Sequence, residues 1–202
     1  MASAVKNPSV ALPTLQDKAG TALFKRITSA ENLEYNRNKK LPIKERLPDF
    51  MVKLQGTAEL LRHYWMEGRK NPALHTEVTM LQVQTLHLGV LGSELADEFI
   101  PTLQKDDKYQ TRMAGLEKIK RGMTQMFTGM ETSLSEVNFY QPADFSSMLE
   151  AMAATVPRYA MVMSAEEKTS MVKRMSALRP RFKQESDLKS IDIILSALKP
   201  QK

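Results

Sequence analysis

The sequence contains no cysteine, few aromatic residues and no long hydrophobic run. The absence of cysteine excludes disulfides, thiolate catalysis, cysteine-ligated zinc and iron–sulfur clusters. No segment approaches the roughly 20 consecutive apolar residues that span a bilayer, so we expect no integral membrane association. The first residues lack the basic and apolar regions of a secretory signal. A cytoplasmic location is therefore the default expectation, although an exported mature form would look the same.

The remaining composition is typical of a helical globular chain. The 202 residues are 42% hydrophobic and 26% charged, which is enough to bury a core without covalent staples. The net charge is +6, but it is unevenly distributed. Residues 1–46 hold 9 basic and 4 acidic groups, residues 47–163 hold 11 and 14, and residues 164–202 hold 9 and 5. A continuous phosphate-binding face would therefore require the two basic ends to meet in space.

Apolar residues recur at helical spacing along most of the chain. We expect helices over about 14–34, 47–68, 71–101, 106–137, 144–156, 164–178 and from 186 or 187 onwards. No segment alternates with period two, and neither Asn-Gly nor Asp-Gly occurs as a hairpin signal. The predicted fold class is all-α, a globular bundle of six or seven helices with short basic connections.

The same pattern predicts a simple domain organisation. Residues 1–13 have no periodicity and are expected to form a flexible tail. Residues 14–202 are expected to form a single helical domain, with a possible subdivision near 101–106 or 138–143.

Several local signals predict where helices begin, bend and end. Thr14 is expected to cap the first helix, and the residue pattern around Pro48 places that proline in a first turn. Another helix is expected to end before Pro157. Gly89 and Gly92 interrupt a regular helical stripe, which indicates a bend or the close approach of a neighbour.

Short catalytic and cofactor-binding motifs are missing from the sequence. It has no Gly-x-Gly-x-x-Gly, phosphate-binding loop, His-Glu-x-x-His, Gly-x-Ser-x-Gly or calcium loop. The three histidines, His63, His75 and His87, also lack the Glu-x-x-His spacing of di-metal sites in helical bundles. We therefore predict no catalytic residue, metal or cofactor. An enzyme whose site is assembled from scattered helical residues remains an alternative.

Methionine is the unusual component of the sequence, with ten of the 14 lying between Met113 and Met175. Their helical spacing favours core positions, whereas a methionine-lined groove would accept partner helices of varied shape. From this we predict a non-catalytic protein-binding module, such as an adaptor, chaperone, immunity-type inhibitor or assembly subunit, whose partner is another protein or a second copy. The predicted partner-binding residues are Lys120, Met123, Met126, Phe127, Met130, Tyr159, Met161 and Met163.

Two basic clusters support an alternative function, sequence-nonspecific nucleic-acid binding. Lysine and arginine contacts to phosphates supply affinity without reading sequence. No helix-turn-helix, zinc-finger or RNA-binding signature accompanies them. The residues predicted for this alternative are Arg37, Lys39, Lys40, Arg179, Arg181 and Lys183.

Overall fold

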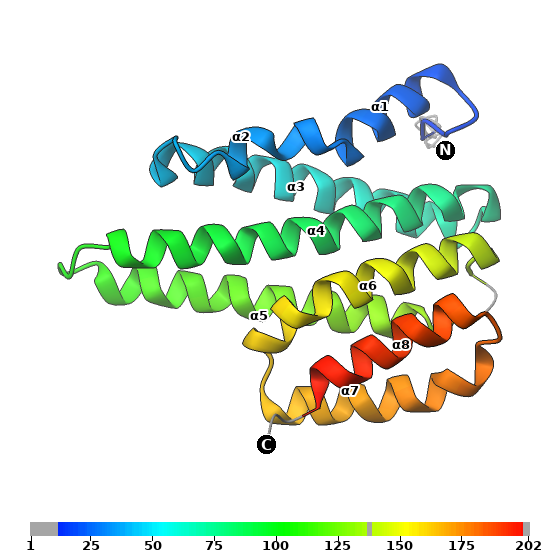
Figure 1. Cartoon of the computed structure of the whole chain (residues 1–202). Coiled ribbons are helices and arrows are strands. Elements are labelled where there is room, and N and C mark those ends of the chain that lie inside the picture. The colour runs from blue at the N-terminus through cyan, green and yellow to red at the C-terminus, as the bar shows by residue number, and fades with distance from the viewer. Residues whose placement is uncertain (1–11, 137–138, 200–202) are drawn as a thin grey trace, which may run out of the picture.

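Helices form nearly all of the structure, a computed structural model that describes residues 12–136 and 139–199 (Figure 1). The α-helices are α1 (Lys18–Thr28), α2 (Glu34–Arg37), α3 (Ile43–Gly68), α4 (His75–Phe99), α5 (Tyr109–Ser133), α6 (Pro142–Val162), α7 (Ala165–Leu178) and α8 (Glu185–Leu198). Short 3₁₀ helices are η1 (Ala30–Leu33), η2 (Pro72–Leu74), η3 (Ile100–Thr102) and η4 (Arg179–Arg181). The described residues contain no strand, so the all-α prediction is confirmed, with eight α-helices in place of six or seven.

The extra helix arises because the segment expected as one helix over 14–34 is divided. Asp17, not Thr14, caps α1, since its carboxylate accepts a 2.6 Å hydrogen bond from the Gly20 N–H. At Ser29 the backbone becomes extended, and the Ser29 hydroxyl accepts a hydrogen bond from the Asn32 N–H. A serine that caps a new turn ends the preceding helix, which explains the break.

Two helices extend past prolines that were expected to bound them. Helix α3 begins at Ile43, so Pro48 lies inside the helix, on an exposed face where water can satisfy the carbonyl that lacks an N–H partner. Helix α6 continues beyond Pro157 to Val162. Its last turn is retained because Tyr159 is fully buried and its hydroxyl donates a 3.0 Å hydrogen bond to the Leu86 carbonyl.

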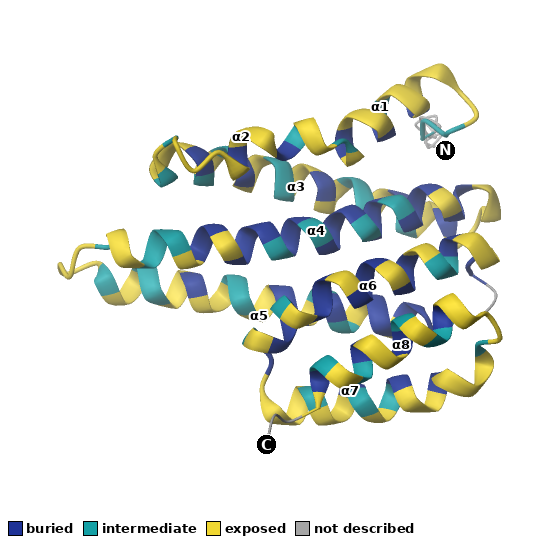
Figure 2. Ribbon diagram, viewed as in Figure 1, coloured by how far each residue is buried: buried dark blue, intermediate teal, exposed yellow. Residues whose placement is uncertain are grey.

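Helix α4 lies at the centre of the bundle and packs against α1, α3, α5 and α6 (Figure 2). Close packing there depends on two glycines. A Cβ atom at Gly89 would lie 2.0 Å from the Tyr159 hydroxyl, and one at Gly92 would lie 2.8 Å from the Phe50 ring. The glycines thus permit close approach by α6 and α3, as their position in the sequence indicated.

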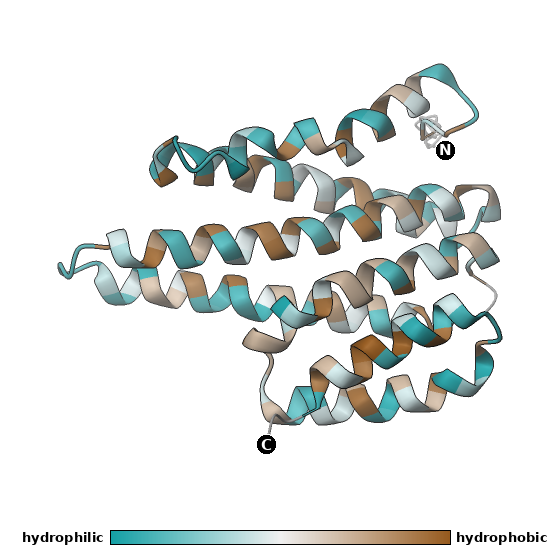
Figure 3. Cartoon of the chain, viewed as in Figure 1, coloured by the Kyte–Doolittle hydropathy of each residue, from teal (hydrophilic) through white to brown (hydrophobic). Residues whose placement is uncertain are grey.

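The C-terminal helices complete the core, because α8 packs against both α6 and α7. Ile191, Ile194 and Leu198 are fully buried, and Figure 3 shows the hydrophobic residues of α8. The run from Ile191 to Leu195 is apolar except for Asp192. This run has the composition of a strand, but here it lies within a helix, as predicted. A capping box of Ser164 and Glu167 begins α7.

The predicted tail, residues 1–13, lies mostly outside the described residues. Within the described part, the Tyr64 hydroxyl donates a hydrogen bond to the Pro13 carbonyl, and the Leu15 N–H donates to the Glu77 carboxylate at 2.7 Å. The possible boundary at 138–143 also begins outside the described residues. Over the part that the structure describes, no helix is both long and apolar enough to cross a bilayer.

Candidate functional site

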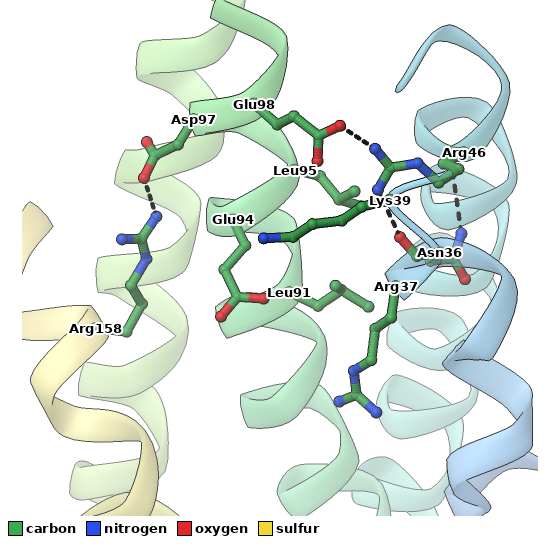
Figure 4. Close-up of a pocket in the computed structure, with 10 residues that line it drawn as sticks. All are labelled: Asn36, Arg37, Lys39, Arg46, Leu91, Glu94, Leu95, Asp97, Glu98 and Arg158. Carbon is green, nitrogen blue, oxygen red and sulfur yellow. Dashed lines mark hydrogen bonds and ion pairs between the residues drawn. The ribbon is translucent and has the colours of Figure 1, made fainter. Parts of the chain in front are cut away.

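A polar cleft of about 580 Å³ is formed between the central helix α4 and its neighbours (Figure 4). Helices α2, α3, α4 and α6, together with the turn after α2, contribute its walls. The polar cleft is lined by Asn36, Arg37, Lys39, Arg46, Leu91, Glu94, Leu95, Asp97, Glu98 and Arg158. This volume is in the range of small-molecule sites.

A buried polar network fixes the wall formed by α2 and α3. The Asn36 side chain is fully buried and donates hydrogen bonds of 3.0 Å to the Arg46 carbonyl and 2.9 Å to the Asp49 carboxylate. It also accepts a 2.9 Å hydrogen bond from the Lys53 ammonium. Because Asn36 bonds to α3 at three points, the short helix α2 is held against it.

Arg46 joins this wall to the central helix. Its guanidinium is only 1% exposed and donates to the carbonyls of Leu41 at 2.9 Å and Asn36 at 3.0 Å. The same guanidinium forms an ion pair with Glu98 on α4. A buried arginine must be paired and hydrogen-bonded, and Arg46 meets both requirements.

The opposite rim is fixed by Arg158 on α6. Its guanidinium donates a 2.7 Å hydrogen bond to the Ser93 hydroxyl and forms an ion pair with Asp97. Two of the three acidic groups of the cleft, Asp97 and Glu98, are therefore neutralised within the protein.

Three charged groups of the cleft have no ion pair among the described residues: Arg37, Lys39 and Glu94. Figure 4 shows the Lys39 side chain directed across the cleft toward Glu94, whereas Arg37 points along the cleft away from them. Burial, together with the positive charge of Arg37, lowers the pKa of His87. The Arg37 guanidinium thus lies close enough to His87 for its charge to be felt there.

A second candidate is an apolar groove of about 340 Å³ between α3 and α5. Its lining residues are Ala58, Leu61, Arg62, Trp65, Gln82, Met126, Gly129 and Met130. An adjoining hollow of about 510 Å³ shares Trp65 and Gly129 and extends across the outer face of α5 to Arg174 on α7. We refer to the two hollows together as the α5 trough.

Three glycines lie on α5 at intervals of seven residues: Gly115, Gly122 and Gly129. All are exposed, and a Cβ atom at any of them would meet no atom within 4 Å. Packing inside the chain therefore does not require glycine there, although each glycine costs about 1 kcal/mol of helix stability relative to alanine. Gly129 lies on the floor of the trough, and the seven-residue interval places Gly122 and Gly115 on the same side of the helix.

The predicted partner-binding residues are mostly core residues. Met123, Phe127, Met130, Tyr159 and Met163 are at most 6% exposed, so they do not present the expected exposed surface. Their spacing matches the apolar stripes of α5 and α6, which the core covers. Of the five, only Met130 lines the apolar groove, and a binding role for these residues stays a prediction.

The three other predicted residues lie in different settings. Met126 is half-buried in the groove, Lys120 is half-buried and paired with Glu117, and Met161 is 72% exposed on α6. No α6 residue lines the groove, so Met161 does not join Met126 in one surface.

The two basic clusters do not form one face. The turn between α2 and α3, which carries Lys39 and Lys40, and the link between α7 and α8, which carries Arg181 and Lys183, lie at opposite ends of the bundle (Figure 1). Arg179 is engaged with Asp192 through hydrogen bonds of 2.8 and 2.9 Å.

The histidines occupy three unrelated environments. His63 is exposed, and His75 is buried, stacked on Phe139 with its Nε2 2.9 Å from the Gly68 carbonyl. His87 is half-buried on α4. Among the described residues, no three His, Asp or Glu side chains lie together in a way that could hold a metal ion.

Comparison of the chain with protein-family models, with curated proteins and with solved structures gives no match.

The sequence alone did not identify most residues of the polar cleft or of the α5 trough. Arg37 and Lys39 were identified only as members of a basic cluster, while Asn36, Arg46 and Glu94 carried no motif that would join them. The glycine repeat of α5 was visible as a seven-residue period, and that signal could have identified the floor of the trough.

Proposed function

We propose that this protein is a non-catalytic helical module that binds an amphipathic helix of another protein in the α5 trough. The observation that carries the proposal is the open apolar groove between α3 and α5, where Leu61, Trp65 and Met126 are only partly covered. Grooves lined by Leu, Met and Trp accept the apolar face of a helix. Methionine suits such a site because its flexible thioether adapts to the partner.

The floor of the trough favours a helix as the occupant. Glycines without neighbours on an exposed helix face allow a second backbone to approach closely. Their seven-residue interval is two helical turns, which is the repeat of a packed helix pair. The unfavourable helix propensity of Gly115, Gly122 and Gly129 would be offset by contacts with the partner.

The charges around the trough favour an acidic partner. Arg62 lines the groove, and Lys118 and Arg121 are exposed on α5 beside the glycines. None of the three has an ion pair among the described residues. Glutamate or aspartate beside the apolar face of the partner helix would complement them and set its orientation.

The absence of cysteine makes a direct test possible. In Gly122→Cys, a single thiol on the glycine side of α5, two helical turns before the trough residue Gly129, is labelled with a photo-cross-linker and exposed to an extract of the native source. Gly56→Cys is the matched control, because Gly56 is also helical and exposed with open space around it, but it lies on the side of α3 away from the groove. A partner segment that cross-links only from position 122 is then synthesised as a peptide and its affinity measured.

We expect this peptide to be helical when bound and to lose at least about tenfold in affinity with Met126→Asp or Gly129→Leu. Circular dichroism checks that both variants retain the fold. Equal cross-linking from positions 56 and 122, or affinity that Gly129→Leu leaves unchanged, overturns the proposal. Cross-linking only to a second copy of this chain also overturns it, in favour of self-association.

A further inference from the structure

We infer that the polar cleft is a binding site for a small molecule that carries two carboxylates and one amino group, the charge pattern of an acidic amino acid or a short acidic peptide. This site is independent of the α5 trough, since the polar cleft and the trough share no lining residue.

Hydrogen bonds and ion pairs hold the two sides of the cleft against α4. Asn36 and Arg46 are buried, hydrogen-bonded and tied to α4 through Glu98. Arg158 ties the opposite rim to the same helix through Asp97. A preformed polar cavity lowers the entropic cost of binding a small polar ligand.

The charges that remain after internal pairing define the ligand. Arg46 is neutralised by Glu98 and Arg158 by Asp97. Two cationic groups, Arg37 and Lys39, and one anionic group, Glu94, are left without ion pairs among the described residues. A ligand with two negative charges and one positive charge would satisfy all three, whereas inorganic phosphate would face the repulsion of Glu94.

The three charged residues come from two sides of the cleft, although the Lys39 side chain reaches across toward Glu94. Arg37 and Lys39 belong to α2 and the turn after it, whereas Glu94 belongs to α4 (Figure 4). Leu91 and Leu95 on α4 are buried and also line the cleft. The carboxylates of the ligand would bind the first wall, its amino group would bind Glu94, and its methylene groups would cover the two leucines.

Calorimetric titration with L-glutamate and with the dipeptide Gly-Glu tests the inference. Both probes have two carboxylates and one amino group, and they differ in the span between the charges, so the tighter binder distinguishes an amino acid site from a peptide site. Glutarate lacks the amino group and 4-aminobutyrate lacks one carboxylate. We expect each of these two to bind at least about tenfold more weakly, because each loses one charge-assisted interaction.

Variants then identify the residues. Lys39→Gln and Glu94→Gln are each expected to lower the affinity for the tighter-binding probe by about tenfold or more. Lys40→Gln is the matched control for Lys39→Gln, because Lys40 is the adjacent exposed lysine and does not line the cleft. It should leave the affinity unchanged.

A second readout comes from His87, whose imidazole signals can be assigned by comparison with His87→Gln. The positive charge of Arg37 contributes to lowering the pKa of His87. A carboxylate bound to Arg37 would offset that charge, so the pKa of His87 should rise when the ligand binds. Arg37→Gln should raise the pKa of His87 without ligand and abolish the further rise.

Four outcomes overturn the inference. The first is that neither L-glutamate nor Gly-Glu produces binding heat or changes the pKa of His87. The second is that glutarate or phosphate binds as tightly as these probes, which would make the cleft a simple anion site. The third is equal loss of binding in Lys39→Gln and Lys40→Gln. The fourth is salt-sensitive binding of a single-stranded oligonucleotide that Lys39→Gln and Lys40→Gln both weaken, which would show that these lysines bind phosphates.

Discussion

Gly89→Ala should destabilise the protein, although alanine is normally the better helix residue. The Tyr159 hydroxyl donates a hydrogen bond to the carbonyl of Leu86, one turn before Gly89 on α4. A Cβ atom at position 89 would lie 2.0 Å from that hydroxyl and 2.6 Å from the Met126 methyl. Met126 can move aside because its end is flexible, but Tyr159 is fully buried and packs against the tilted ring of Phe127, with 4.7 Å between the ring centroids.

The magnitude follows from three contributions. Helix propensity favours alanine by about 1 kcal/mol. Overpacking costs about 1 to 3 kcal/mol, and loss of the hydrogen bond from Tyr159 to Leu86 costs about 1 kcal/mol. The net loss in the free energy of unfolding is about 1 to 3 kcal/mol, or a fall in Tm of about 2 to 4 °C for each kcal/mol in a chain of this size.

Urea unfolding followed by circular dichroism measures this loss, and a double-mutant cycle identifies its cause. Tyr159→Phe alone should cost about 1 kcal/mol. Because it removes the hydroxyl that meets the new methyl group, the pair Gly89→Ala and Tyr159→Phe should be more stable than the sum of the single changes by about 1 to 2 kcal/mol.

Gly56→Ala is the control for this cycle. It adds a methyl group where nothing lies within 4 Å, and it should stabilise the protein by about 1 kcal/mol. Strict additivity in the cycle, or a Gly89→Ala variant as stable as Gly56→Ala, would refute the packing argument.

Three further predictions concern buried polar groups. Asn36→Ala should lower the free energy of unfolding by about 2 to 3 kcal/mol, measured in urea, because it removes the partners of Arg46, Asp49 and Lys53; Asn38→Ala, in the exposed turn, is the control. Burial raises the pKa of Glu131 despite the opposing effect of Arg174, and its Oε1 has no hydrogen-bond partner. The stability contributed by protonated Glu131 is present below its ordinary pKa and is lost as pH rises through the raised pKa, so Glu131→Gln should gain stability relative to the wild type between pH 4 and pH 7; a constant difference would contradict this. Burial also raises the pKa of three tyrosines, that of Tyr64 to about 12, so the stability they contribute is full below pH 10 and is lost as pH rises through their raised pKa values. Absorbance at 295 nm should therefore show their ionisation above pH 10 together with unfolding, and ionisation of all tyrosines in one step near pH 10 with the fold intact would contradict it. The three tyrosines of this last prediction are Tyr64, Tyr140 and Tyr159.

The fold class followed from the sequence because the apolar spacing is continuous and nothing in the chain offers a strand partner. Gly89 and Gly92 were also interpreted correctly, since glycine inside a regular apolar stripe has few explanations other than close packing or a bend. The errors came where tertiary contacts outweigh local preference. Burial of Tyr159 carries α6 past Pro157, and hydrogen bonds from Arg46 support the first turn of α3.

The candidate sites were much less predictable. A periodic pattern shows which face of a helix is buried without showing what buries it, so Met123 and Phe127 were proposed as contact residues although they are buried and line neither part of the trough. The polar cleft joins residues from 36 to 158, and no spacing rule brings Arg37, Glu94 and Arg158 together. Their proximity arises from the packing of α2, α3 and α6 around α4.

The unequal burial of α4 and α5 implies that the bundle does not open uniformly. Both helices have 25 residues, yet 16 are buried in α4 and seven in α5. In the first half of α5, from Tyr109 to Gly122, only Leu116 is buried, and this half projects with α4 beyond α6 to α8 (Figure 1). Amide hydrogens there should exchange through local fluctuations, whereas those of α4 should exchange only when the whole molecule unfolds.

The polar cleft is therefore built on the most extensively buried of the long helices, whereas the α5 trough is lined by the second half of α5, next to its sparsely buried first half. A partner that fills the trough would slow amide exchange along α5, and part of its binding energy would be used to order that helix.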